Sequence, residues 1–259
     1  MGGDKRFMRG AMPKLGSCNV FLRATFGIDP GAEIGRQLGE LATQVQVMRG
    51  QEVQTDPADT TLVFLASGAT KLGAQASRER HQIVAFHFGG DIFTVPAVSM
   101  HRYMLIGLCE STLTTFPARQ FYDRAASNPW IMRALLERSH TALFRCRDKA
   151  VNLGQKTAGE RVAGFLLAMW ERLDASEGSS PLIDLPMSRG DIGESLGLKI
   201  ETVSRQFTKL REAGIIDTHG RSGVSLLDLP RLAEQAGYYD RNTAPPRPEW
   251  VERKPELVP

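Results

Sequence analysis

Cysteine is scarce in this chain of 259 residues, and its three thiols, Cys18, Cys109 and Cys146, stand far apart. Isolated thiols in odd number argue against a disulfide framework and are typical of a protein in the reducing cytoplasm. No two of them form a CxxC pair, so the sequence does not support a zinc ribbon or a self-contained iron–sulfur site. We therefore expect a cytoplasmic protein without a metal site.

The sequence also lacks a long apolar run and a strong charge of either sign. No apolar segment reaches about 18 residues, which argues against a membrane span or a secretion signal. The net charge of +3 permits a nucleic-acid partner without requiring one. No nucleophile–base pair, metal-ligand cluster or phosphate-binding glycine loop is present, so we expect no enzymatic activity. A chain of 259 residues is long for one core, and two domains are expected.

The first half of the chain has the pattern of a small antiparallel β protein. Residues 1–28 show no clean periodicity and are expected to form an N-terminal arm. The spacing of Ile34, Leu38, Leu41 and Val45 then predicts a short helix. Beyond Gly50, short apolar runs are broken by turn residues, in the segments TLVFLASGATKLG, RHQIVAFHFGGDIFTV and RYMLIGLCESTLTTFP. Such runs at regular spacing predict a small antiparallel barrel or jelly roll.

A long helix follows the predicted barrel. Asn128 is a good N-cap, and Pro129 suits the first helical position. Seven residues then recur at alternating spacings of four and three: Met132, Leu136, Ser139, Leu143, Cys146, Ala150 and Leu153. This a/d seam is typical of two helices packed along their length. The seam could pack on the chain's own barrel or on a second copy, and we expect it to form a homodimer interface.

The remaining residues predict a compact C-terminal domain. An amphipathic helix, AGERVAGFLLAMWERL, is followed by the turn-rich DASEGSSP and a short strand pair, LIDLPM. Ser188 then caps the helix RGDIGESL, and a second helix runs from about Ile200 to Ala213, with Gly214 as its C-cap. The run IIDTHGRSGVSLLD predicts a β-hairpin, so the whole is a winged helix-turn-helix. Residues 239–259 are Pro-rich and polar and predict a disordered tail.

Glu201, Ser204 and Arg205 share one face at the front of the second helix, which lies in the major groove in this motif. Arg205 suits guanine, Glu201 can accept from cytosine, and Ser204 can reach a base edge or a thymine methyl. The alternative is a solvated face with a Glu201–Arg205 ion pair, but the surrounding motif favours base reading. Contacts to DNA phosphates are expected from Ser188, Lys199, Thr202, Lys209 and Arg221, with Arg211 and His219 as further candidates.

The run MSRGDIGESLGLKIETVSRQFTKLREAGII, with AGERVAGFLLAMWERL and QIVAFHFGGDIF, resembles the CRP/FNR family of bacterial transcription regulators, in its FNR and FixK branch. The resemblance covers most of residues 45–237. It implies an α+β homodimer with a β-roll sensor domain (29–124), a dimerisation helix (125–154) and a winged helix-turn-helix (155–238). The family pattern E-x-x-S-R falls on Glu201, Ser204 and Arg205. Ile200 stands where CRP-type members carry arginine, so the resemblance implies an FNR-like palindrome with TTGAT half-sites. It also implies RNA polymerase as a further partner.

The departures from the family concern the signal. FNR-like oxygen sensors hold an iron–sulfur cluster with four cysteines, a number that this chain does not contain. The phosphate cassette of cyclic-nucleotide binders is missing, since Arg102 is followed by Tyr103. Haem is an alternative cofactor, with His87, His101 or Cys109 as axial ligands, but each is better explained as a structural residue. We expect no cofactor. The alternatives left are a regulator whose DNA binding depends on a small molecule or haem in the roll, and a ligand-regulated module that contacts protein.

Overall fold

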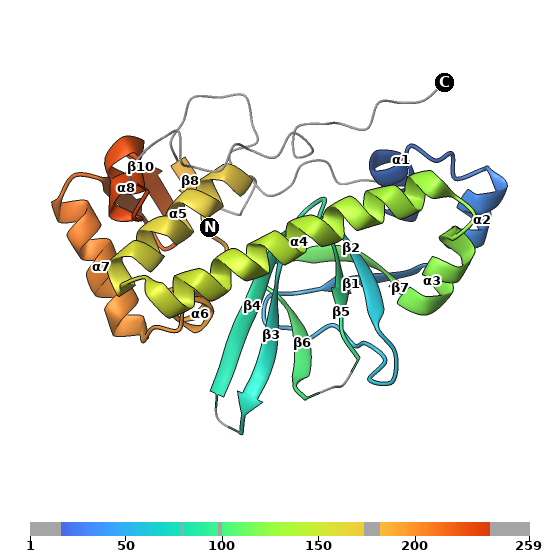
Figure 1. Cartoon of the computed structure of the whole chain (residues 1–259), viewed down its shortest axis with the longest axis horizontal. Coiled ribbons are helices and arrows are strands. Elements are labelled where there is room, and N and C mark those ends of the chain that lie inside the picture. Colours follow the sequence, from blue (N-terminus) through green and yellow to red (C-terminus); the bar gives the residue numbers. More distant parts are fainter. Residues whose placement is uncertain (1–16, 79, 98–99, 174–181, 239–259) are drawn as a thin grey trace. The chain divides into compact units, whose positions relative to one another are not determined.

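The computed structural model describes residues 17–78, 80–97, 100–173 and 182–238. These residues divide into two compact units, one that ends at Arg145 and one that begins at Cys146. The helices and strands of each unit are drawn in Figure 1. The predicted tail at 239–259, the turn-rich DASEGSSP and the first part of the predicted arm lie outside the described residues. Within the described ranges, no helix is long and apolar enough to cross a membrane.

The first unit is a β-roll of two antiparallel sheets. The four-stranded sheet has the order β1-β7-β2-β5 and the three-stranded sheet the order β4-β3-β6. The strands are β1 (Thr43–Val47), β2 (Thr61–Ser67), β3 (Ala69–Ser77), β4 (Arg80–Phe88), β5 (Ile92–Val95), β6 (Arg102–Gly107) and β7 (Ser111–Pro117). The predicted jelly-roll class is confirmed, because turns at the expected glycines separate β2 from β3 and β4 from β5.

Strand β2 supplies both layers of the core by simple alternation. Val63 and Leu65 point into a cluster with Leu72 and Leu105 of the three-stranded sheet. Leu62 and Phe64 point the other way, into a second cluster that four helices complete. These helices are α1 (Ser17–Phe26), α2 (Glu33–Gly39), α3 (Ala118–Ala125) and the first turns of α4 (Pro129–Gln155). Strand β2, in the interior of the four-stranded sheet, is therefore buried on both faces.

The structure corrects the predicted arm and the predicted helix after it. Residues 17–26 form helix α1, and Phe21 and Leu22 are fully buried against β2 and β7. The helix predicted from Ile34 to Val45 ends at Gly39, because Thr43–Val47 pairs with β7 as strand β1. Tertiary pairing with a strand far along the chain outweighs the local helical spacing here.

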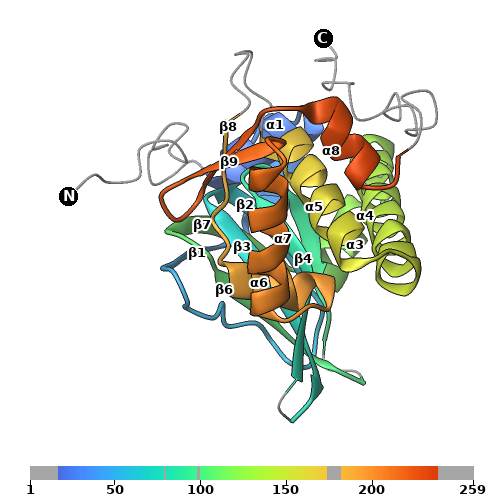
Figure 2. The ribbon, with the colours of Figure 1, turned by 90° about the vertical axis from the view of Figure 1, so that its left-hand side faces the viewer.

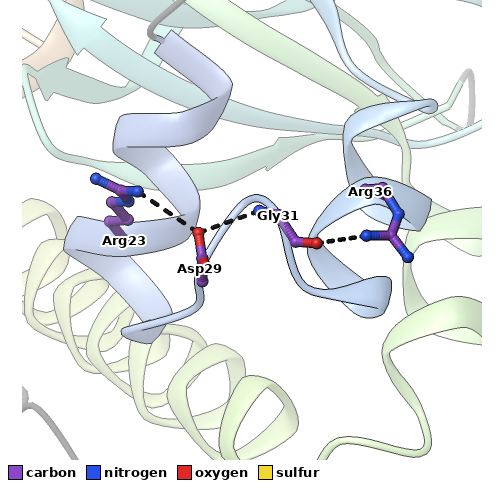
Figure 3. A network of polar contacts seen from close by, with 4 residues as sticks. All are labelled: Arg23, Asp29, Gly31 and Arg36. Atoms are coloured by element: carbon purple, nitrogen blue, oxygen red, sulfur yellow. Dashed lines mark hydrogen bonds and ion pairs between the residues drawn. The ribbon is translucent and has the colours of Figure 1, made fainter.

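A polar network fixes the connection between α1 and α2 (Figure 3). Asp29 Oδ1 accepts from Gly31 N at 3.1 Å and from Arg23 Nη2 of α1 at 3.5 Å. Arg36 of α2 donates to the carbonyl of Gly31. The turn between the two helices is thus held from both sides by exposed polar contacts.

Helix α4 begins where the sequence predicts. Asn128 Oδ1 accepts from the N–H groups of Trp130 and Ile131 at 3.1 and 3.2 Å, as an N-cap does. Ile131 and Leu135 are buried in the helix-facing core cluster of the roll. On the same side, burial lowers the pKa of Arg138, while Asp91 in the β4–β5 turn favours its charged form. This face of α4 therefore belongs to the roll.

The second unit contains the last turns of α4 and a winged helix-turn-helix. Its elements are α5 (Ala158–Leu173), β8 (Leu182–Asp184), α6 (Arg189–Leu196), α7 (Ile200–Glu212), β9 (Ile216–His219), β10 (Gly223–Leu226) and α8 (Leu229–Gln235). The predicted strand pair at LIDLPM is a single strand, β8, because its partner is β10 of the wing. Figure 2 shows α6 and α7 side by side, next to the sheet of order β8-β10-β9.

Candidate DNA-binding surface

The first helix of the motif, α6, begins at a capping box. Ser188 Oγ accepts from Asp191 N at 3.1 Å, and Asp191 Oδ2 accepts from Ser188 N at 2.8 Å. The Ser188 hydroxyl also donates to Asp191 Oδ2 at 2.6 Å. The backbone N–H groups of Ser188 and Asp191 at the helix start are thereby satisfied. Ser188, which the sequence predicts as a phosphate contact, is therefore also the residue that fixes where α6 begins.

Two glycines make the tight turn between α6 and α7. Gly197 closes α6 with a φ of 65°, a left-handed conformation that favours glycine. A Cβ on Gly193 would lie 2.6 Å from the carbonyl oxygen of Leu198, so only glycine lets the turn fold back on α6. Lys199 then precedes the first residue of α7 in extended backbone. The close approach sets the start of α7 against α6.

Helix α7 buries one face and exposes the other. Val203, Phe207 and Leu210 are buried in the unit. Glu201, Ser204 and Arg205 are all exposed, in the first turns of the helix, as the sequence predicts. In the described part of the chain, Glu201 and Arg205 do not form an ion pair with each other or with any other residue. The three side chains are thus free to meet an external partner, and the alternative of an internal ion pair is not supported.

Arg189 locks α6 onto α7 and was missed in the sequence. Its guanidinium lies over the Phe207 ring, 3.3 Å from the ring centroid. Burial lowers the pKa of Arg189 to about 10, and the group remains charged at neutral pH. Such a cation–π contact is worth about 0.5–2 kcal/mol, depending on how far it is desolvated. An arginine at the first position of a helix and a phenylalanine 18 residues later form no recognisable pattern in a sequence.

Most of the predicted phosphate contacts are exposed, on α7, just before it and in the wing. Lys199, Lys209 and Arg221 are exposed, as is the further candidate Arg211, and Thr202 is half-buried. Arg221 lies in the wing turn between β9 and β10. His219 is less available, because its Nε2 is 2.9 Å from Ser225 Oγ across the hairpin. Exposed lysine and arginine side chains on α7, just before it and in the wing are the residue types that neutralise DNA phosphates.

The predicted seam on α4 lies on a different face from the residues that contact the roll. Met132, Leu136 and Leu143 are 37%, 56% and 46% exposed in the single chain. Ser139, Cys146 and Ala150 are also exposed, while Leu153 is half-buried. A Cβ on Gly197 would lie 3.5 Å from Leu153 Cδ2, so this last seam residue also borders the turn of the motif. Within the first unit, the seam residues from Met132 to Leu143 are therefore not used to pack the helix on the roll.

The roll residues considered as cofactor ligands are engaged in structural contacts. The His87 ring is stacked on Phe93, with centroids 3.5 Å apart, and its Nδ1 is 3.8 Å from Asp91 Oδ2. Cys109 Sγ is 3.9 Å from Ser111 Oγ. Arg102 pairs with Glu52 at 3.3 Å at the surface. Across the described ranges, no three His, Cys, Asp or Glu side chains lie close enough together to hold a metal ion.

Glu201, Ser204 and Arg205 are exposed at the front of the second helix, with cations and a wing nearby. This arrangement is that of a sequence-specific DNA-binding protein. Comparison with known proteins agrees with this class. Residues 160–235 match the model of the Crp-like helix-turn-helix domain. The nitrogen fixation regulation protein FixK of Bradyrhizobium diazoefficiens is 36% identical over 199 residues, which are 76% of this chain and 83% of that protein.

Further relatives place the chain more narrowly. The transcriptional activator protein FnrL of Cereibacter sphaeroides is 30% identical over 210 residues, 76% of this chain and 84% of FnrL. The solved structure of FixK2 from Bradyrhizobium japonicum has a TM-score of 0.66 at 32% identity, covering 75% of this chain and 96% of that one. A CooA mutant from Carboxydothermus hydrogenoformans, 18% identical over 76% of this chain and 88% of its own, shares the fold with a TM-score of 0.65.

The chain belongs to the CRP/FNR family, in its FixK branch. It is a DNA-binding transcription regulator, and its relatives are regulators, not enzymes. The family resemblance, the α+β fold class and the winged helix-turn-helix predicted from the sequence are confirmed.

Proposed function

We propose that this protein binds DNA as a homodimer, at an FNR-like palindrome with TTGAT half-sites, and works with RNA polymerase in the cytoplasm. One observation carries the proposal: Glu201, Ser204 and Arg205 are exposed together at the start of α7, and none of them pairs with another of the described residues. A role with RNA polymerase is supported by the relative FnrL, a transcriptional activator protein.

The reading set, which consists of Glu201, Ser204 and Arg205, suits the chemistry of the proposed half-site. Arg205 can donate two parallel hydrogen bonds to guanine O6 and N7, which fits the guanine of TTGAT. Glu201 can accept a hydrogen bond from the N4 amine of a cytosine. A carboxylate repels phosphate, so its presence here suits a surface that reads bases and not one that binds only the DNA backbone. Ser204 is short enough to approach a base edge or a thymine methyl. Ile200 is exposed beside this set and adds an apolar surface where an arginine would add charge.

The homodimer is supported by the apolar seam that α4 leaves in contact with solvent. Its leucines and methionine recur over three heptads on a face that the roll does not cover. Each apolar side chain buried between two copies of the helix would contribute about 25 cal/mol per Å² of area removed from water. Two reading helices about one turn of DNA apart would then each meet a half-site.

A binding titration against single-base variants of the half-site tests base reading. Arg205→Ala should lose discrimination at the guanine of TTGAT, at about 1–3 kcal/mol, because the bidentate pair is gone. Lys209→Ala is the matched control on the same exposed helix, and it should weaken binding to all sequences alike and reduce the salt dependence. An Arg205→Ala protein that keeps the base preference of the wild type would refute the assignment.

Sedimentation of a seam variant tests the dimer. Leu143→Glu places a charge in the middle of the seam and should give monomers, because a buried unpaired carboxylate is costly. Glu137→Lys changes an exposed charge on the same helix, away from the seam, and should leave the dimer intact. If Leu143→Glu sediments as a dimer, the seam is not the interface.

We further propose that the protein needs no resident cofactor. The His87 ring packs flat on Phe93 with Nδ1 facing Asp91, and Cys109 Sγ lies next to Ser111 Oγ, which supports structural roles for both. The absorption spectrum of protein purified without oxygen should show neither a Soret band nor a broad iron–sulfur band. A Soret band would favour a haem-responsive regulator instead.

A further inference from the structure

Arg161 of α5 lies where three segments of the second unit meet. Its Nε donates to the carbonyl of Lys156 at 2.8 Å, in the corner between α4 and α5. Its Nη2 donates to the carbonyl of Leu153 in the last turn of α4, also at 2.8 Å. Its Nη1 donates to the carbonyl of Leu196, the last residue of α6, at 3.0 Å. Every nitrogen of one guanidinium thus binds a different carbonyl.

The choice of arginine follows from what these carbonyls are. The last carbonyls of a helix have no partner within the helix and carry the negative end of its dipole. Two helices, α4 and α6, end at this point, so a cation is favoured there. The planar fork of arginine can serve three acceptors in fixed directions, whereas a lysine ammonium is a single point of charge. Arg161 therefore joins the two helix ends rigidly.

A second cation joins the same two helices one turn away. Lys149 of α4 donates from Nζ to Ser195 Oγ of α6 at 3.0 Å, and Ser195 is buried. The corner between α4 and α5 is closed by its own capping box, in which Glu160 Oε2 accepts from Thr157 N at 2.8 Å. The last turns of α4 are thus tied to the first helix of the motif by side chains from both α4 and α5.

These contacts link two surfaces with different tasks. Cys146, Ala150 and Leu153 of the seam lie on the same turns of α4 that Lys149 and Arg161 hold. At the other end, α6 continues through the tight turn at Gly197 into the reading helix α7. A change in the tie between α4 and α6 would therefore rotate the reading helix relative to the seam.

We infer that Arg161, assisted by Lys149, is a positioning residue for DNA recognition, which sets the half-site spacing that the protein accepts. The inference rests on the homodimer proposed above, because the seam fixes one copy relative to the other. All three guanidinium nitrogens of Arg161 donate hydrogen bonds to carbonyls of its own chain. Arg161 therefore affects DNA binding indirectly, through the positions of α6 and α7.

The experiment measures the binding of the full chain to palindromes whose half-sites are separated by spacers of different length. Arg161→Lys keeps the charge and removes the fork. It should bind the preferred spacer about tenfold more weakly, because charge-assisted bonds to the helix ends are lost. Its preference among spacers should shrink by about the same factor, as the reading helices become less fixed. Discrimination at the guanine within a half-site should stay as in the wild type.

Two further variants separate positioning from stability. Arg231→Lys is the matched control, because Arg231 Nη1 of α8 donates to Ala213 O at the end of α7, within the reading domain and away from α4. It should lower the melting temperature without changing the spacer preference. If Arg161→Lys does not fold, Lys149→Met probes the same tie from α4 and should also flatten the preference among spacers. All variants are melted in parallel.

The outcomes are distinct. If Arg161→Lys or Lys149→Met flattens the spacer preference and keeps base discrimination, the positioning role is supported. If both lose affinity equally at every spacer, so that the spacer preference stays as in Arg231→Lys and the wild type, the role is only structural and the inference is overturned. A wild-type protein with no spacer preference would overturn the proposed homodimer, and this inference with it.

Discussion

Phe21→Ala tests the corrected view of the N-terminal segment, in which α1 is part of the core. Phe21 is fully buried, and its ring centroid lies 4.9 Å from that of Phe64, 5.1 Å from Phe26 and 5.2 Å from Phe116. Truncation of a buried phenylalanine costs about 3–5 kcal/mol, and a cluster of aromatic pairs favours the upper part of this range. We expect a loss of about 4 kcal/mol, a large part of the roughly 5–15 kcal/mol of a typical domain.

The assay is urea unfolding, with hydrogen exchange of β2, β7 and α7 to show which unit is weakened. Phe21→Ala should lower the midpoint and the protection of β2 and β7, while α7 keeps its protection. Arg23→Ala is the control on the same helix: its ion pair with Asp29 at 3.5 Å is exposed, so it should cost less than about 1 kcal/mol. If Phe21→Ala costs no more than Arg23→Ala, α1 does not belong to the core and the correction of the arm is wrong.

Two further predictions concern the second unit. Gly193→Ala should destabilise it by about 1–3 kcal/mol and weaken DNA binding, because the new Cβ would lie 2.6 Å from Leu198 O. Thermal melts measure the loss, and Gly159→Ala is the control. It should show no such loss, because its Cβ would meet only Gln206 Oε1 at 3.4 Å. Burial lowers the pKa of Lys149 from 10.5 to about 8, so the unfolded chain binds more protons between these values. The free energy of unfolding of the wild type, relative to that of Lys149→Met, should therefore rise with pH across that window, by up to about 3 kcal/mol. Urea titrations of both proteins at pH 7.5 and 10.5 measure this. If the two proteins differ in stability by the same amount at both pH values, the prediction is wrong.

The motif was predictable because its signals are local. Ser188 with Asp191, Gly197, and the hairpin glycines each fix a helix end or a turn through neighbours a few residues away. The reading set follows from the same helix, since Glu201 and Arg205 are four residues apart. Asn128 and Pro129 mark the start of α4 in the same way.

The parts that sequence reasoning missed depend on partners far along the chain. Residues 17–26 form a helix because β2 and β7 offer an apolar face to cover, which no local spacing indicates. Thr43–Val47 becomes a strand because β7 pairs with it. The contact of Arg189 with Phe207 and those of Arg161 with three carbonyls need the folded unit before they exist.

The division of α4 between the two units makes dimerisation and DNA binding thermodynamically linked in the proposed dimer. Met132, Leu136, Ser139 and Leu143 belong to the unit of the roll, and the seam residues from Cys146 onward belong to the unit of the reading helix. If dimerisation increases the affinity for a palindrome by some factor, then binding of the palindrome must increase the affinity of the two chains for each other by the same factor. The concentration of the protein in the cell would then act as a signal in its own right, since halving the chain concentration reduces the dimer by more than half.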